Sequence, residues 1–114
     1  MKITFFETPA FTRYLADYMD DDEYRALQHA LMENQAMGEV IQGTGGFRKL
    51  RWRDPRRGKG KRGGLRIIYY HFVKDQQIWL FTLYDKNEAD DLTAAQKRAM
   101  KRAIEAEKKA RQTI

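Results

Sequence analysis

Arginine, lysine and tyrosine side chains are the groups in this chain best suited to chemistry. Arg66 lies at the start of a strand-like segment beside the pair Gly63-Gly64, where the backbone can approach a ligand closely. Lys59 and Lys61 stand in the glycine-rich stretch before it, and Lys86 follows the last strand-like segment. Guanidinium groups match phosphate oxygens in bidentate geometry, so these residue types favour a phosphate-containing partner.

Other kinds of catalytic site are excluded or poorly supported. The chain has no cysteine, which removes disulfides, cysteine-ligated zinc and thiol catalysis. The two histidines, His29 and His71, are not spaced as metal ligands, and there is no Gly-x-Ser-x-Gly motif. The acidic run 20–23 is interpreted as a helix start and not as a metal site. We therefore expect no metal and no cofactor, whereas hydrolysis by two carboxylates stays open.

Arginine, lysine and tyrosine can cut RNA without a metal, because the ribose 2′-OH of the substrate supplies the nucleophile. The protein must hold the scissile phosphate in line, neutralise charge on its oxygens, take one proton and give one. Aromatic rings can hold splayed bases by stacking. The composition permits this chemistry and permits passive RNA binding equally well.

Each candidate also has a purely structural interpretation. Arg66 can serve an ion pair, Lys86 can be a turn residue, and Lys59 and Lys61 can be solubility charges. His71 is interpreted as a half-buried strand residue in preference to a base. Three tyrosines are interpreted as core residues in preference to site residues, namely Tyr69, Tyr70 and Tyr84.

The positive charge of the chain is concentrated in its middle. Residues 1–42 carry three Lys/Arg and eight Asp/Glu, whereas residues 43–66 carry ten Lys/Arg and only Asp54. Residues 67–114 are nearer balance, with nine basic and seven acidic residues. Such a local field attracts polyanions, nucleic acid above all. The alternative is a solvated basic loop.

The first half of the chain predicts a strand and two helices. Residues 3–6 are β-branched and aromatic, as in a short strand. Thr8 and Pro9 are typical of a helix start. The acidic run 20–23 opens a second helix, for which Asn34 and Gly38 are the stop signals.

The second half predicts three strands and a helix. The strands cover residues 47–53, 65–73 and 78–84, and the second of them is apolar on both faces. A capping box at Thr93 and Gln96 opens the C-terminal helix. In the strand 47–53, alternation predicts one basic face and one apolar face. The basic face would carry Lys49, Arg51 and Arg53, and the apolar face Leu50 and Trp52.

These elements, in the order β-α-α-β-β-β-α, predict an α+β fold with a single domain over residues 1–114. We expect an antiparallel sheet with a mixed edge, two N-terminal helices on one face and a C-terminal helix. The other face, partly uncovered, would carry the basic residues. No apolar run approaches the roughly 20 residues needed to span a bilayer, so we expect a soluble cytoplasmic protein without membrane contact.

Three segments, in this order, resemble the RelE/ParE superfamily of bacterial toxins. They are residues 43–51 (GTGGFRKLR), 58–70 (GKGKRGGLRIIYY) and 83–88 (LYDKNE). The sequence is most similar to the HigB-type branch of type II toxin–antitoxin modules, and the similarity covers nearly the whole chain. It implies a RelE-like α+β fold.

The resemblance also implies an activity, that of a metal-independent, ribosome-dependent endoribonuclease. Such an mRNA interferase cleaves mRNA in the ribosomal A site through 2′-OH attack and leaves a cyclic phosphate, which inhibits translation. On that pattern Arg66 stabilises the transition-state phosphate, and the other catalytic positions are Lys86, Lys59 and Lys61. The residues implied to bind RNA are Arg48, Lys49, Arg51, Arg62 and Tyr84. No aromatic residue follows Tyr84, so the proton-shuttling group stays open.

The partners implied by the resemblance are mRNA, the ribosome and a cognate antitoxin protein. Two other functions stay open, because one fold can carry several activities. They are a ParE-like inhibitor of DNA gyrase and a non-catalytic RNA-binding module. The dense basic loop that runs into Arg66 favours the nuclease.

Overall fold

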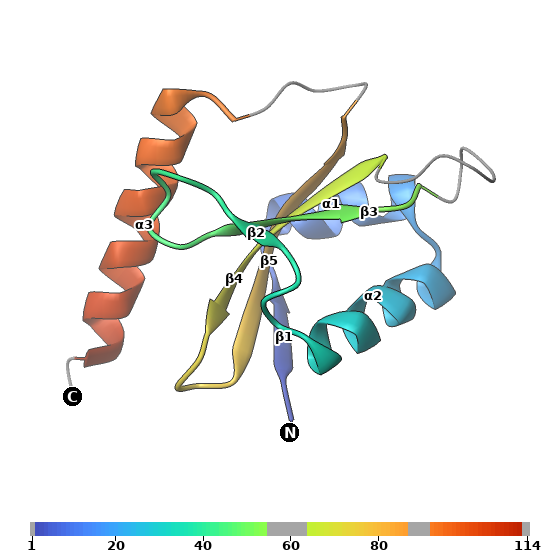
Figure 1. Ribbon diagram of the computed structural model, residues 1–114, viewed down its shortest axis with the longest axis horizontal. Helices are drawn as coiled ribbons and strands as arrows, with labels where there is room; N and C mark the ends of the chain where they lie inside the picture. The colour runs from blue at the N-terminus through green and yellow to red at the C-terminus, as the bar shows by residue number, and fades with distance from the viewer. Residues whose placement is uncertain (1, 55–63, 87–91, 113–114) are drawn as a thin grey trace.

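Three helices and five strands make up the part of the chain that the computed structural model describes, residues 2–54, 64–86 and 92–112 (Figure 1). The α+β class predicted from the sequence is confirmed. The elements are β1 (Thr4–Glu7), α1 (Pro9–Tyr18), α2 (Asp21–Glu33), β2 (Glu39–Val40), β3 (Arg48–Trp52), β4 (Leu65–Phe72), β5 (Gln77–Asp85) and α3 (Ala94–Gln112). The sequence did not predict β2, because a strand of two residues carries no periodicity.

The strands form one mixed sheet in the order β1-β5-β4-β3-β2. β1 runs parallel to β5, and the other neighbouring pairs are antiparallel. The expected antiparallel sheet with a mixed edge is therefore confirmed. β4 lies at the centre, between β5 and β3.

Helices lie on both faces of the sheet, α1 and α2 on one side and α3 on the other (Figure 1). Leu27 and Leu31 of α2 are fully buried on the first side, which we call the α1–α2 face. Ile104 of α3 packs on the second side, the α3 face. Neighbouring residues Ile67 and Ile68 of β4 join different cores, because successive strand side chains point to opposite faces. The face expected to be partly uncovered is thus crossed by α3.

Side chains cap the helices where the sequence predicted. The Thr8 hydroxyl accepts a hydrogen bond from the Phe11 N–H at 3.1 Å, and the Asp20 carboxylate caps α2. The Thr93 N–H donates to the Gln96 side chain at 2.8 Å, and the Gln96 N–H donates to the Thr93 hydroxyl at 3.1 Å. The acidic run therefore serves a helix start, and the capping box of α3 is confirmed.

A bulge in β5 decides which of its side chains face α3. Ile68 pairs with Thr82 and Tyr69 with Leu80, so Phe81 is an extra residue. The Phe81 carbonyl accepts a hydrogen bond from the Thr8 hydroxyl at 2.6 Å. The extra residue shifts the in–out alternation of β5 by one position. Odd-numbered Trp79 before the bulge and even-numbered Tyr84 after it therefore both pack on the α3 face. Among the described residues, no helix is long and apolar enough to cross a membrane.

Leu27→Ala tests the α1–α2 face as the main core. Because this side chain is fully buried, its truncation is expected to lower the free energy of unfolding by about 2–5 kcal/mol. His29→Ala, on the exposed side of the same helix, should change it by less than about 0.5 kcal/mol. Urea unfolding followed by circular dichroism measures both, and equal losses would contradict this packing.

Candidate functional site

Three side chains form a row across the sheet near the start of β4. Arg51 of β3 lies opposite Arg66, and Arg66 lies opposite Tyr84 of β5. Tyr84 packs against the α3-face core, and Arg66 precedes Ile68 of that core by two residues. Directly paired residues share a face, so all three side chains point to the α3 face. We call them the Arg51–Arg66–Tyr84 row.

The row places two like charges next to each other. Directly opposed residues of an antiparallel pair have Cβ atoms about 4.5–5.5 Å apart, and like charges at that separation repel. Arg51 is exposed, and Arg66 is half-buried with its Nη1 donating to the Leu65 carbonyl at 3.2 Å. An anion bound across both guanidinium groups would relieve the repulsion and accept several hydrogen bonds.

A small hollow of about 70 Å³ adjoins the row on the α3 face. It is lined by Ile41, Lys49, Tyr84, Leu92 and Lys97. Lys49 pairs with Ile68 in the strand register, which places it on this face. Two lysines and one tyrosine therefore line this small space.

The structure brings four of the sequence-predicted site residues together, namely Lys49, Arg51, Arg66 and Tyr84. Lys86 is exposed directly after β5, and its N–H donates to the Gly64 carbonyl at 3.0 Å, which continues the ladder beside the row. Lys59, Lys61 and Arg62 lie outside the described residues.

Two basic residues of the same segment lie elsewhere. Arg48 donates to the carbonyls of Gly38 at 2.7 Å and Ala36 at 3.4 Å, so it supports the connection between α2 and β2. Arg53 was expected beside Arg51 on the basic face, and this was wrong. β3 ends at Trp52, and Arg53 pairs with Glu23 of α2 at 3.2 Å.

Sequence reasoning missed Lys97 as a site residue. It is one of seven basic residues in the C-terminal segment, so its charge alone does not distinguish it from the others. Its spacing of three from Met100 and seven from Ile104 places it on the inner stripe of α3. That helical periodicity was the signal that could have found it.

Two buried carboxyl groups lie at the same end of the sheet. Asp54 is 1 % exposed and Asp85 is 0 % exposed, and both take part in interactions within the protein. A Cβ added to Gly64 would lie 3.1 Å from the Asp54 Cβ, so a side chain at this position would crowd Asp54. The glycine before β4 thus serves packing at the base of the row.

His71 lies at the far end of β4, five residues or about 16 Å along the strand from Arg66. It is half-buried, as the sequence interpretation favoured. Burial, and then the nearby charge of Arg48, lower the pKa of its imidazole. The structure therefore separates His71 from the row.

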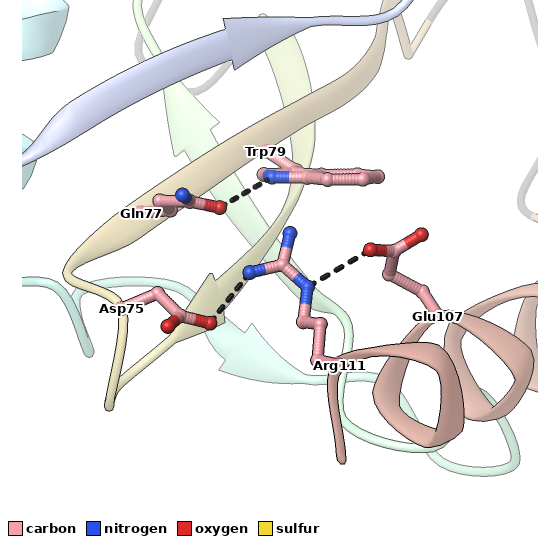
Figure 2. A network of polar contacts seen from close by, with 5 residues as sticks. All are labelled: Asp75, Gln77, Trp79, Glu107 and Arg111. Carbon is pink, nitrogen blue, oxygen red and sulfur yellow. Dashed lines mark hydrogen bonds and ion pairs between the residues drawn. The ribbon is translucent and has the colours of Figure 1, made fainter. Parts of the chain in front are cut away.

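A larger hollow, of about 520 Å³, also lies at that far end. Arg111 of α3 is fixed beside it by ion pairs with Asp75 at 2.5 Å and Glu107 at 2.9 Å (Figure 2). Its guanidinium carbon lies 3.8 Å from the centre of the Phe72 ring. We call these contacts the Arg111 clamp. These contacts fasten α3 to the sheet, which gives Arg111 a structural role. The row is therefore the stronger candidate for chemistry.

Arg51→Gln tests the repulsion within the row. Removing one of two opposed like charges is expected to raise the free energy of unfolding by about 0.2–1 kcal/mol at low salt. The gain should shrink at 1 M salt, where the Debye length is about 3 Å. Arg25→Gln, which removes an ion pair with Asp22 on α2, should give no gain in the same urea titrations. A less stable Arg51→Gln protein would argue against the repulsion.

His71→Gln tests the lowered imidazole pKa. Because the folded pKa lies below the ordinary value of 6.5, the neutral form is favoured in the fold. Its stabilising contribution is complete above pH 6.5 and is lost as the pH falls through the folded pKa. The wild-type protein should therefore lose more stability than His71→Gln between pH 7.5 and 5. Identical pH profiles of thermal unfolding would contradict this.

No model of a known protein family matches this chain. The function must therefore be inferred from the geometry of the α3 face. That face presents Arg51, Arg66 and Tyr84 in register, with Lys49 and Lys97 around an adjoining hollow. The arrangement can bind and polarise a phosphate group.

Proposed function

We propose that this protein is a RelE-like toxin of a type II toxin–antitoxin module that cleaves mRNA in the ribosomal A site without a metal. The observation that carries the proposal is the Arg51–Arg66–Tyr84 row, two opposed guanidinium groups beside a tyrosine on one face of the sheet. The similarity of residues 43–51, 58–70 and 83–88 to the RelE/ParE superfamily supports it from the sequence.

The row suits the charge that develops during cleavage. The 2′-oxygen attacks phosphorus and the 5′-oxygen leaves, which yields a cyclic phosphate and a free 5′-hydroxyl. Arg66 and Arg51 would bind the non-bridging oxygens, whose negative charge increases in the transition state. Tyr84 supports Arg66 from β5, with its ring packed on the core.

Two protons must move, one from the 2′-OH and one to the 5′-oxygen. Lys86 is exposed two ladder positions beyond the row, so it is a candidate for one transfer. Lys59 and Lys61 are the other candidates, and they lie outside the described residues. A lysine that acts as the base must itself be neutral at the working pH.

The proposal includes a cytoplasmic location and a cognate antitoxin encoded by a neighbouring gene. A partner that supplies acidic and apolar side chains would complement the cationic α3 face or a sheet edge. We expect the purified toxin to recover that gene product in a pull-down at moderate salt. Failure to recover it would count against the toxin–antitoxin assignment.

Arg66→Ala should abolish cleavage. Loss of a group that stabilises transition-state charge lowers the rate by roughly 10²–10³-fold. The measurement is primer extension on a defined mRNA in a reconstituted translation reaction, with and without ribosomes. Wild-type protein should give cuts in A-site register only on translated message.

Arg25→Ala provides the matched control, because this arginine lies on α2, across the sheet from the row. It should cleave like the wild-type protein, and both variants should show wild-type circular dichroism. Intact message at high wild-type concentration would overturn the nuclease proposal. Equal cleavage by Arg66→Ala would remove the row from the mechanism.

A further inference from the structure

We propose that the hollow beside the row binds a second phosphate group of the same RNA strand, and that Lys97 thereby makes α3 part of the substrate site. This inference rests on the proposed function. It adds to the row a contact from a different element of the fold, at residues Lys49, Tyr84 and Lys97.

Lys97 is placed as a ligand-binding lysine would be. It is half-buried against the sheet, whereas the next residue, Arg98, is exposed. Within residues 2–54, 64–86 and 92–112, no hydrogen bond or ion pair joins the Lys97 ammonium group to a carboxylate. A half-buried ammonium group that meets no carboxylate of the described residues adds positive potential to the hollow.

The chemistry of the hollow fits a phosphate group. Lys49 on one wall and Lys97 on the other bring two ammonium groups to the same space, and lysine binds phosphate as a point charge. The hollow is small, about 70 Å³, and the backbone phosphate is the anionic group that RNA offers to two ammonium groups.

The position of the hollow fits a phosphate adjacent to the one on the row. Lys49 precedes Arg51 by two residues on the same face of β3, about 7 Å along the strand. This is comparable to the spacing of successive phosphates in an extended nucleic-acid strand. One RNA strand can thus place one phosphate on the Arg51–Arg66–Tyr84 row and the next in the hollow.

The fold holds Lys97 at this place from both ends of α3. The capping box at Thr93 and Gln96 fixes the first turn, directly before Lys97. At the other end, Arg111 fixes the last turn through its ion pair with Asp75 (Figure 2). The Arg111 guanidinium also lies over the Phe72 ring. A lysine on a helix so fastened meets a phosphate with little loss of conformational freedom.

The test is the binding of a fluorescent RNA hexanucleotide, 2′-O-methylated so that it cannot be cleaved, to the full chain at low salt. Lys97→Gln is expected to weaken binding roughly tenfold, the order of one charge-assisted contact. It should also reduce the slope of log affinity against log salt by about 0.7. Lys97→Arg, which keeps the charge, should recover most of the affinity.

Arg98→Gln is the matched control, because it makes the same charge change one residue away on the exposed side of α3. It should weaken binding less than twofold. Urea midpoints equal to that of wild type exclude a folding defect in either variant. Equal weakening by both substitutions, or no RNA binding by the wild-type protein, would overturn the proposal.

Two further results separate this inference from the proposed function and from a free anion. Lys97-dependent binding of the hexanucleotide without cleavage of translated message would uphold the hollow and refute the nuclease. Cleavage that depends on Arg66, together with RNA binding that does not depend on Lys97, would support the nuclease and refute the role of the hollow. Inorganic phosphate could shift the NMR signals around Lys97 while Lys97→Gln leaves the affinity for RNA unchanged. In that case the hollow binds a free anion and the proposal fails.

Discussion

The covering of β4 on both faces is the constraint on which the rest of this structure depends. Its side chains alternate between two cores, with Ile67 and Tyr69 in one and Ile68 and Tyr70 in the other. Such a strand cannot carry charge along its middle, because burying an ion without a partner costs far more than apolar contacts return. Charge can stand only near an end of the strand, and Arg66 is one residue from that end.

The same constraint explains why the row lies where α3 begins. Met100 and Ile104 cover the apolar middle of the sheet, so Lys97 reaches the margin of the covered region. There Lys97 lines the same hollow as Lys49 of β3 and Tyr84 of β5. The cations therefore gather at the boundary between core and solvent, where an arginine can be half-buried and still reach a ligand.

Much of this arrangement could be predicted from local pattern. Side-chain caps begin all three helices, at Thr8, Asp20 and Thr93. Each cap joins residues three apart in the chain, so the local sequence is enough to predict it. The alternation in β3 correctly placed Leu50 toward the α1–α2 core and Lys49 toward the other face.

What could not be predicted depends on contacts between distant segments. The bulge at Phe81 is tied to a hydrogen bond with Thr8, 73 residues away in the chain. Arg53 leaves the basic face because Glu23 of α2 comes within reach. The family resemblance supplied Arg66 as a candidate, but only the strand register pairs it with Arg51.

The two parts of the site are held with different strength. The row lies on strands of the central sheet, whereas Lys97 lies on a helix with only two buried residues, Met100 and Ile104. The Arg111 clamp adds cation–π contact, worth about 0.5–2 kcal/mol, and partly exposed ion pairs worth about 0–1 kcal/mol each. A phosphate shared by Lys49 and Lys97 would bridge the sheet to this helix, so by linkage it would strengthen the docking of α3 as much as docking strengthens its binding.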